Sequence, residues 1–486
     1  MAGLLFFTCI HPSNNCLQKR YLLIMSQIND RSNTTNNQSD IQLKIKSLNE
    51  SGEGVGYYRQ YLLTVEKTLP GEEIIIHYLP QHPRKNRIQL QKIIKKSPMR
   101  IEPPCPYFGQ CGGCQLQHLA YPAQLQWKQQ MIRDLLSDFP ELQSVQVHPV
   151  APMPGETHYR CKTQLPFQHK DQALVYGLYQ QGTHEITPID QCLVESRDAN
   201  RVLEIVKDWA EHSKIPIYNE HTHSGSLRHV LIRKGQFSHQ VMVVLVNRTA
   251  ELPHLNKLLE LLKAGIPSLK SLIVNHNPAK TNRILGGNNQ VIWGEGFIEE
   301  KLGRLSFRIY PNTFFQSNPV QMLRLIDLLI KKAELQVTDK VLEIYCGTGI
   351  IGLLLNSHIH QLMGFDNNPD SIKTAQENAA RNDISRTEFH IQDLSNGLPT
   401  RLSGNFQPDI IIADPPRKGL PQKLMQDMAD LQPEKIIYIS CNPKTLIANL
   451  SEFQKLGYIT HEIHPFDMFP YTAQVECLAV MEKRQE

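Results

Sequence analysis

VLEIYCGTGIIGLLLNSHIHQLMGFD, residues 341–366, carries the strongest structural signal in this chain. A short apolar run predicts a strand, a turn with Gly347, Gly349 and Gly352 follows it, and an apolar helix continues from the turn. A second short run ends at Asp366. Glycines let a backbone pass close to a ligand, and a carboxylate roughly 20 residues further on can bind a ribose hydroxyl pair. The stretch therefore predicts a site for a nucleotide-type cofactor, and a nicotinamide dinucleotide stays open because the glycines also fit its fingerprint.

Strands and helices alternate around this stretch. A helix is expected at about 320–333, and further helices and apolar strands follow Asp366. One of these strands ends at Asp414 and another at Cys441. The alternation predicts an α/β fold with a doubly wound parallel sheet, whose ligands lie beyond the carboxyl ends of the strands. Asp366, Asp414 and Cys441 are therefore expected over one cleft.

The polar residues at these strand ends suggest covalent chemistry. Asp414 precedes two prolines, which make a stiff loop that fixes its carboxylate. Cys441 stands where a nucleophile should stand, and Glu476, on an expected last strand, can serve as a base. Each residue alone is a weak signal, because a single cysteine after a strand is more often part of a core than a catalyst.

A cysteine-rich segment lies far upstream. Cys105, Cys111 and Cys114 fall within ten positions, and Cys192 follows downstream. Four soft thiolates suit either tetrahedral zinc or a cubane iron–sulfur cluster. The spacing fits neither a paired-CxxC zinc site nor the common ferredoxin run, and buried thiols without a ligand are the alternative.

Length and composition set the outer limits. A chain of 486 residues is expected to hold two or three domains. Its net charge of +4 means that a nucleic-acid surface would be a local patch. No apolar run is long enough to span a membrane, and the apolar start lacks the features of a signal peptide. Ten sparse cysteines fit a reducing cytosol, so a cytoplasmic location is expected.

The region before the cysteines divides into two parts. Residues 1–40 are expected to be disordered, since residues 26–40 are rich in Asn, Ser and Gln, and Met25 is a candidate natural start. Residues 41–101 contain short strands with glycine turns, which predict a small barrel of the oligonucleotide-binding type. A basic run follows, for which phosphate contact is favoured over a solvated charged strand pair: Arg84, Lys85, Arg87, Lys92, Lys95, Lys96 and Arg100.

Residues 102–308 are expected to form a central α/β domain that carries the cysteine cluster. A helix is predicted at about 121–138, and the continuous apolar run at 241–246 predicts a buried strand. Cys161 has no partner in the sequence, so a packed core thiol is expected. Residues 309–486 form the expected doubly wound domain.

Several motifs together resemble the RNA uracil-5-methyltransferases, which make 5-methyluridine from S-adenosylmethionine. The resemblance covers about residues 41–481 and rests on CPYFGQCGGCQLQH, the distal Cys192, NTFFQSNP, LEIYCGTG, ADPPRKGL, YISCNPKTL and PFDMFPYTAQVE. It implies an amino-terminal TRAM barrel that binds RNA and a carboxyl-terminal methyltransferase domain. It also implies a 4Fe-4S cluster on Cys105, Cys111, Cys114 and Cys192, and so favours iron–sulfur over zinc.

The resemblance assigns further roles. It implies cofactor contacts at Gln316, Tyr345, Asp366 and Asp414, and less firmly at Asp393. The family's nucleophile and base match Cys441 and Glu476: the thiolate adds at uracil carbon 6, and the carboxylate removes the proton from carbon 5 after methylation. The target base must leave its stack, which is easier in a loop or bulge. Gln474 departs from the family, which often has histidine there, and residues 1–40 have no family counterpart.

Three other functions are compatible with parts of the sequence. A nicotinamide dehydrogenase explains the glycines and Asp366 but leaves the Cys441–Glu476 pair without a role. An adenine or amide N-methyltransferase could use the acid before two prolines and needs no thiol. A non-catalytic RNA-binding protein could keep the fold. Within the family, a cluster-bearing member is expected to act as a monomer on large-subunit (23S) ribosomal RNA, with tRNA as the alternative.

Overall fold

The computed structural model describes residues 40–78 and 88–485 and divides into two compact units. The smaller unit reaches Glu102 and includes His118–Ala120, and the larger unit comprises Pro103–Gln117 and the chain from Tyr121 onward. The expected amino-terminal extension, with Met25, lies outside the described residues, as do Arg84, Lys85 and Arg87 of the basic run. In the part of the chain that is described, no helix combines the length and apolar character that crossing a bilayer requires.

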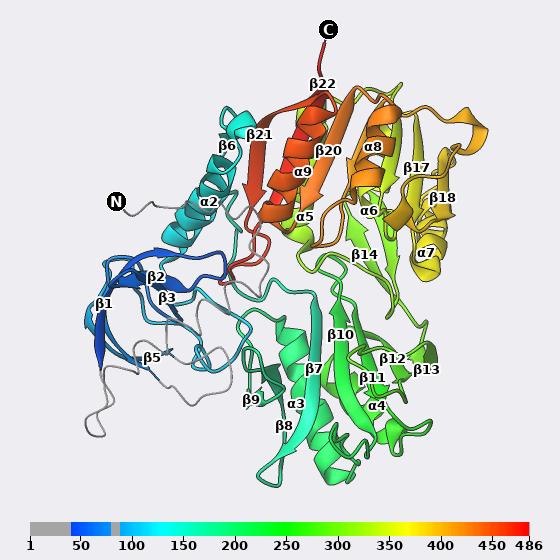
Figure 1. Cartoon of the computed structure of the whole chain (residues 1–486). Helices are drawn as coiled ribbons and strands as arrows, with labels where there is room; N and C mark the ends of the chain where they lie inside the picture. Colours follow the sequence, from blue (N-terminus) through cyan, green and yellow to red (C-terminus); the bar gives the residue numbers. More distant parts are fainter. Residues whose placement is uncertain (1–39, 79–87, 486) are drawn as a thin grey trace. The chain divides into compact units, whose positions relative to one another are not determined.

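The smaller unit is a five-stranded antiparallel sheet, drawn in blue in Figure 1. On its first strand Ile41, Leu43 and Ile45 point inward, alternating with exposed residues as a half-buried strand requires. The short strands expected from the sequence are confirmed. In the order β3-β2-β1-β4-β5 they are Tyr61–Val65, Gly54–Tyr58, Ile41–Leu48, Glu73–Tyr78 and Ile88–Lys95.

Arg100, the last residue of the basic run, has a structural partner in this unit. Its guanidinium donates to both oxygens of the buried Glu72 carboxylate, at 2.5 and 2.9 Å. Burial alone would raise the pKa of Glu72, but the hydrogen bonds from Arg100 outweigh it and lower that pKa. Arg100 therefore fixes the turn before β4 and is not free for phosphate.

The larger unit contains a seven-stranded sheet with helices α3 (Arg197–His212) and α4 (Leu255–Gly265) on one face (Figure 1). The run expected as a buried strand is confirmed as β11, which is buried along its whole length. A two-stranded ribbon of β14 (Ile298–Leu302) and β15 (Leu305–Ile309) follows. In the order β13-β12-β11-β10-β7-β8-β9 the sheet's strands are Asn288–Gly294, Leu269–His276, Val241–Asn247, Leu227–Lys234, Lys162–Lys170, Ala173–Tyr179 and Ile186–Pro188.

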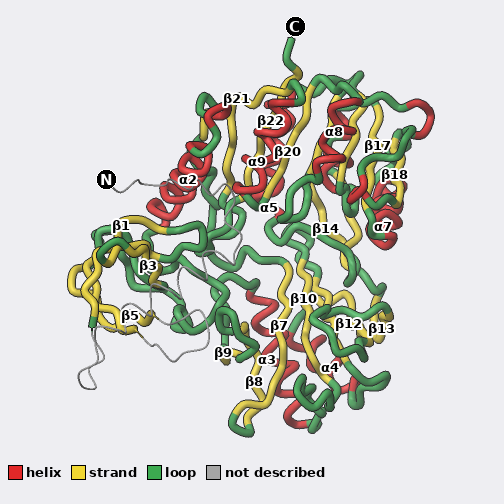
Figure 2. Tube along the Cα trace, viewed as in Figure 1, coloured by secondary structure: helices red, strands yellow, loops and turns green. Residues whose placement is uncertain are grey.

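The second sheet of this unit has eight strands, and Figure 2 shows them in yellow between helices. Five neighbouring strands of the sheet are parallel, as predicted: β18, β17, β16, β19 and β20. β22 then enters antiparallel between β20 and β21. The short β6, from far upstream in the chain, pairs with β21 at the edge. In the order β18-β17-β16-β19-β20-β22-β21-β6 the strands are Thr387–Ile391, Gln361–Asp366, Lys340–Ile344, Ile410–Ala413, Lys435–Ser440, Glu476–Lys483, Tyr458–Phe466 and Gln146–Val147.

Both faces of this sheet are buried, so its central strands read as continuous apolar runs. Along β16, Val341 packs on one side with α5, α6 and α7, while Leu342 packs on the other with α2, α8 and α9. In the order α2, α5, α6, α7, α8 and α9 these helices are Tyr121–Ser137, Pro319–Ala333, Ile350–Leu354, Pro369–Arg381, Gln422–Asp430 and Pro443–Lys455. Short 3-10 turns lie at Pro140–Leu142, Asn356–His358, Leu394–Asn396 and Ser403–Asn405.

Three of these helices begin with the same Asn-Pro pair. Asn318, Asn368 and Asn442 each cap a helix by accepting a backbone N–H from its first turn, and proline occupies the first helical position. Proline lacks the backbone N–H that would have no partner at this position, and the asparagine side-chain oxygen binds another free N–H of the first turn. The pair therefore fixes where the chain leaves each preceding segment and turns into a helix.

Candidate active site

The residues predicted at the strand ends share one edge of the eight-stranded sheet. β16, β17, β19 and β20 run parallel, so Tyr345, Asp366, Asp414 and Cys441 all stand at their carboxyl ends. β22 runs the opposite way, and its first residue is Glu476. The antiparallel return strand therefore delivers Glu476 to the edge where the parallel strands end.

The glycine turn binds the carboxylate of Asp366 directly. Gly347 N–H donates to one oxygen at 3.0 Å, and Asn368 N–H donates to the other at 2.8 Å. Gly347 and Gly349 adopt positive φ angles of 54° and 73°, a conformation that costs glycine little. Tyr345 also has a positive φ, 61°, and strained backbone of this kind concentrates at ligand sites. The turn and its acid are thus preformed.

Beneath the turn lies a buried acid that the sequence reading did not single out. Glu343 on β16 accepts the Gly352 N–H at 3.2 Å. Burial raises its pKa to about 8, and the charges of Asp414 and Asp366 add to the shift. A Cβ atom at Gly352 would stand 2.5 Å from the Glu343 carboxylate, so a larger residue there would displace the buried acid.

Glu476 and Asp414 form a pair of acids at the sheet edge. The Glu476 side chain is buried, with 4% of the residue exposed. Burial raises its pKa well above the ordinary value, the charge of Asp414 raises it further, and Arg417 opposes the shift. Burial also raises the pKa of Asp414 to about 7. Two neighbouring carboxyls with raised pKa values are suited to moving a proton near neutral pH.

Cys441 faces these acids and remains partly exposed. Burial raises its thiol pKa, and the charges of Glu476 and Asp414 raise it further, whereas the charge and hydrogen bond of Arg417 lower it. Arg417 is therefore the cation of this group, and the sequence reading gave it no role although it lies in the Asp-Pro-Pro-Arg run. A thiol, a cation and a buried base are the parts of a covalent catalyst.

Two predicted cofactor residues lie in different settings. Asp393 is exposed, and its carboxylate accepts the Ser395 N–H at 2.9 Å, which lowers its pKa. Its charge still reaches Tyr345, whose phenol pKa is raised by burial and then by Asp393 and Asp366. Gln316 is half-buried in a segment that contacts the glycine turn, since Phe314 O accepts the Thr348 hydroxyl at 3.4 Å.

The cysteine-rich segment brings its thiols into electrostatic contact. Burial raises the pKa of Cys114 to about 11, with Cys111 and Cys105 adding to the shift. Burial likewise raises the pKa of Cys192 to about 12, and Cys114 contributes. The turn expected at Gly112 and Gly113 is present, and the backbone of Gly112 packs so closely that a Cβ there would stand 2.7 Å from the Tyr179 carbonyl.

The spacing of these sulfur atoms bears on what they could hold. Among residues 40–78 and 88–485, one group of three His, Cys, Asp or Glu side chains has all its ligand atoms within 4.8 Å of one another, and that group contains no cysteine. The soft thiolates of Cys105, Cys111, Cys114 and Cys192 suit either zinc or an iron–sulfur cluster.

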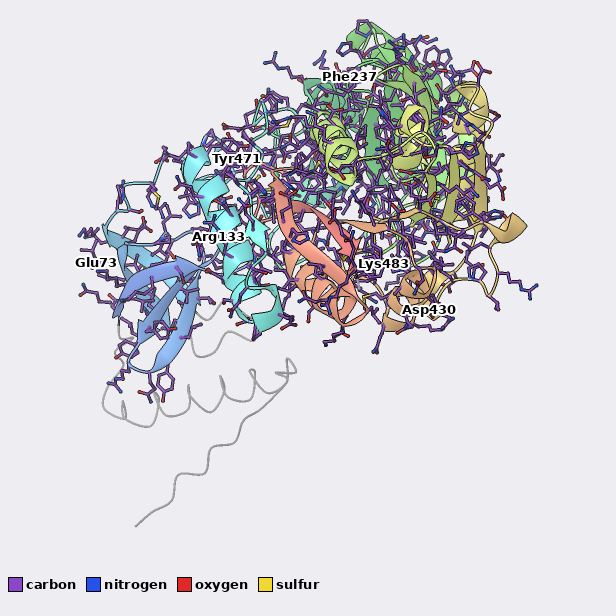
Figure 3. The ribbon with its side chains drawn as sticks, turned by 90° about the horizontal axis from the view of Figure 1, so that it is seen from above. Glu73, Arg133, Phe237, Asp430, Tyr471 and Lys483 are labelled. Atoms are coloured by element: carbon purple, nitrogen blue, oxygen red, sulfur yellow. The ribbon has the colours of Figure 1, made fainter. Side chains whose placement is uncertain are left out.

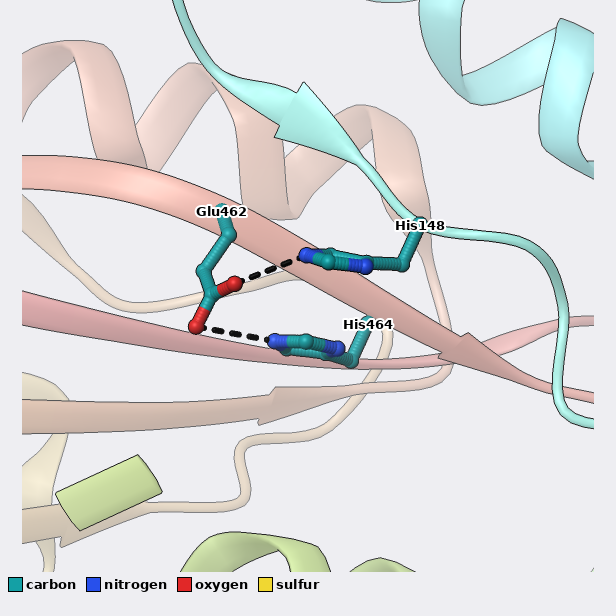
Figure 4. A group of neighbouring side chains, drawn as sticks. All are labelled: His148, Glu462 and His464. Atoms are coloured by element: carbon teal, nitrogen blue, oxygen red, sulfur yellow. Dashed lines mark hydrogen bonds and ion pairs between the residues drawn. The ribbon is translucent and has the colours of Figure 1, made fainter. Parts of the chain in front are cut away.

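The group that does meet this spacing is His148, Glu462 and His464 (Figure 4). The two imidazole rings stack with centroids 4.1 Å apart and planes at 15°, so their nitrogen lone pairs run side by side and do not converge on one ion. Lys332 Nζ lies 2.6 Å from the Glu462 carboxylate. Burial would raise the pKa of Glu462, but hydrogen bonds from Lys332 and both histidines lower it to about 2. We interpret the group as an ion network that joins β6 to β21.

Comparison with known proteins points in one direction. Residues 279–484 match the family model described as tRNA (Uracil-5-)-methyltransferase. A Halalkalibacterium halodurans protein named "Uncharacterized RNA methyltransferase" is 36% identical over 447 residues, which are 92% of this chain and 98% of that protein. A Bacillus cereus protein of the same name is 36% identical over 91% of this chain and 96% of its own.

One solved structure matches nearly the whole chain. It is the tRNA (uracil-54, C5)-methyltransferase of Pyrococcus abyssi in complex with S-adenosyl-L-homocysteine. The two superpose with a TM-score of 0.72 at 29% sequence identity, over 90% of this chain and 99% of that one.

Proposed function

The chain belongs to the RNA uracil-5-methyltransferase family, and we propose that it transfers a methyl group from S-adenosylmethionine to carbon 5 of a specific uridine in RNA. One observation carries this proposal: the thiol of Cys441 and the buried carboxyl of Glu476 interact at the sheet edge that also bears the glycine turn and Asp366. A dehydrogenase has no use for the Cys441–Glu476 pair, and an N-methyltransferase has no use for the Cys441 thiol.

The cofactor contacts follow from the glycine turn. Asp366, oriented by two backbone N–H groups, would accept the ribose hydroxyls, and Tyr345 and Gln316 would line the rest of the site with Asp393 at its exposed end. S-adenosylmethionine, when bound, supplies an electrophilic methyl group. The S-adenosyl-L-homocysteine bound in the P. abyssi enzyme supports this assignment.

Cys441 begins the chemistry in this proposal. Its thiolate adds to carbon 6 of uracil and forms an S–C6 bond, while the electrons of the C5–C6 double bond move onto the C4 carbonyl as an enolate. Carbon 5 thereby becomes nucleophilic enough to take the methyl group, whose bond to the sulfonium sulfur breaks so that S-adenosylhomocysteine would leave. Arg417, whose charge favours the thiolate, keeps a fraction of the sulfur ionised in a pocket that otherwise disfavours the anion.

Glu476 completes the turnover. Its carboxylate takes the proton from the methylated carbon 5, the C5–C6 double bond re-forms, and the bond to Cys441 breaks to release thiolate and product. Asp414 would hold the polar edge of the uracil ring. Burial raises the pKa of Asp414 and so favours its neutral carboxyl, which can donate a hydrogen bond to the ring.

We assign a 4Fe-4S cluster to Cys105, Cys111, Cys114 and Cys192. Their chemistry as soft ligands and their mutual electrostatic contact support a metal centre at this place. Protein purified without oxygen should be brown and contain about four irons per chain. A colourless preparation with one zinc per chain would overturn the assignment.

The proposed substrate is 23S ribosomal RNA, and the five-stranded unit at residues 41–101 is the proposed TRAM domain that contacts it. The domains at residues 102–308 and 309–486 would bind the cluster and the cofactor. The alternative, tRNA, is supported by the similarity to the P. abyssi enzyme, which is a tRNA (uracil-54, C5)-methyltransferase. A non-catalytic RNA-binding role is disfavoured by the presence of both Cys441 and Glu476.

The test measures proton release. The purified protein is given S-adenosylmethionine and RNA tritiated at uracil carbon 5, either 23S transcript or tRNA. We expect one tritium released per methyl group transferred, on the 23S transcript and not on tRNA. Methylation without tritium release would place the methyl on another atom and refute the proposal, while release from tRNA alone would reassign the substrate.

A further inference from the structure

The loop between β21 and β22 leads directly into Glu476, and its midpoint is strained. Tyr471 has a φ of 68°, a left-handed conformation that side chains other than glycine rarely adopt. Such a residue persists only where its surroundings over-determine it. Figure 3 shows Tyr471 beside helix α2, and its backbone contacts explain how the conformation is held.

Both backbone groups of Tyr471 are bound by distant parts of the chain. Its carbonyl accepts N–H groups from Gln115 at 3.0 Å and Leu116 at 2.9 Å, the residues that follow Cys114. Its own N–H donates to the Gln124 side chain on α2 at 3.2 Å. Gln124 is buried, and its amide also donates to Leu116 O at 3.1 Å. One side chain therefore links the cysteine segment to the loop.

Other contacts restrain the loop before Tyr471, and after it Ala473 N–H donates to the Gln115 side chain at 3.4 Å. The buried ammonium of Lys128 lies 2.6 Å from Asp467, and Asn318 donates to Met468 O at 2.9 Å. The hydroxyl of Tyr159 donates to Pro470 O at 3.1 Å. The segment from Asp467 to Pro470 is thus held by side chains from distant parts of the chain. Among the described residues around the strained midpoint, Gln124 is the side chain that binds the Tyr471 N–H.

We propose that Gln124 is a positioning residue for the base Glu476: it holds Tyr471 in its left-handed conformation and so couples the cysteine segment to the active site. This inference rests on the proposed function. Glu476 must reach one proton on a tetrahedral carbon, and a displacement of about 1 Å can slow such a step roughly 100-fold. The addition by Cys441 depends on a different strand end and does not need this loop.

The experiment uses three variants of the full chain. Gln124→Ala removes the hydrogen bonds to Tyr471 and Leu116, and Gln124→Glu keeps the acceptor for Tyr471 N–H. Gln130→Ala removes an exposed glutamine of the same helix. With RNA and S-adenosylmethionine, the Gln124→Ala protein should lose the carbon 5 proton and release methylated RNA roughly 10- to 100-fold more slowly. A denaturant-resistant RNA–protein adduct should accumulate, and the KM for RNA should not change. Gln124→Glu should return most of the elimination rate, and Gln130→Ala should match the unmodified protein.

A second measurement is independent of catalysis. Without RNA, the amides of residues 471–475 should exchange hydrogen at least about 10-fold faster in Gln124→Ala than in the Gln130→Ala control. Unchanged exchange, or adduct formation and elimination slowed equally, would overturn the inference. If the Gln124→Ala protein does not fold, the Gln124→Glu protein is decisive: adduct formation and elimination slowed equally in it would overturn the positioning role of Gln124. An unmodified protein that forms neither methylated RNA nor adduct refutes the proposed function instead, and the exchange result still decides the role of Gln124.

Discussion

Two glutamates on neighbouring strands, Glu462 on β21 and Glu476 on β22, differ in what surrounds them. Glu462 accepts from one lysine and two histidines, and its pKa falls to about 2. Glu476 is buried beside another acid with a single opposing cation, and its pKa rises well above the ordinary value. A carboxylate with matched partners contributes to stability, whereas one whose charge is poorly matched is available for proton transfer. The same residue type thus serves opposite purposes on one pair of strands.

The largest expected effect comes from removing the thiol opposite Glu476. Cys441→Ala should lower methylation by more than roughly 10⁴-fold, in the range typical when a covalent nucleophile is removed. The measurement is methyl transfer to RNA, with circular dichroism to establish that the fold is intact. Cys477→Ala, a buried cysteine on β22, is the matched control and should keep its activity. Full methylation by the Cys441→Ala protein would refute the covalent thiol mechanism.

Replacing Glu476, the acid whose charge is poorly matched, should stop the reaction after methyl transfer. Glu476→Gln cannot take the carbon 5 proton, so turnover should fall about 10²- to 10⁴-fold while the methylated adduct accumulates. Denaturing gel electrophoresis of labelled RNA measures the adduct. Glu462→Gln should give no adduct. If both variants trap RNA to the same extent, the contrast between the two glutamates is wrong.

The pH dependence of turnover should follow the raised pKa values. Glu476 must be deprotonated to act as a base and Cys441 must be a thiolate, and burial raises the pKa of both. The rate should therefore increase as pH rises from 6 to 9, and Arg417→Met should move the rise to higher pH because the opposing cation is lost. A profile that falls over this range would exclude Glu476 as the base.

The smallest expected effect comes from replacing Glu462, and it is on stability. Glu462→Gln should lower the free energy of unfolding at pH 7 by about 1–2 kcal/mol and leave methylation unchanged. Since the folded pKa of Glu462 is about 2, its contribution is fully present above the unfolded value of about 4.5 and is lost as pH falls toward 2. Urea unfolding at pH 7 and pH 3 measures this, and an equal difference at both values would contradict it.

Local patterns predicted the parallel part of the fold well. The apolar runs ending at Asp366, Asp414 and Cys441 are strands, and the helix expected at about 121–138 is α2. Buried parallel strands and glycine turns are specified by adjacent residues, so they can be read from short windows. The placement of Glu476 depended instead on β22 entering antiparallel between two other strands, a pairing that no local pattern encodes.

What the sequence did not reveal depends on partners far along the chain. Arg417 gained its role from electrostatic contact with Cys441 and Glu476, and Gln124 from the backbone of Tyr471. The network around Glu462 requires a histidine 314 positions away. A side chain's partners at such separations are fixed by tertiary packing, so its charge state cannot be read from its neighbours in sequence.

The edge strand β6 has a consequence for how the protein is made. It pairs with β21, and α2 just before it packs against strands that are synthesised hundreds of residues later. During translation the apolar side of α2 must leave the ribosome long before any surface exists to cover it. Such chains fold slowly, because segments far apart in the sequence must come together before their contacts can stabilise the fold. The carboxyl-terminal part expressed alone would lack this strand and helix, and it should accumulate as aggregate unless residues 121–147 are supplied with it.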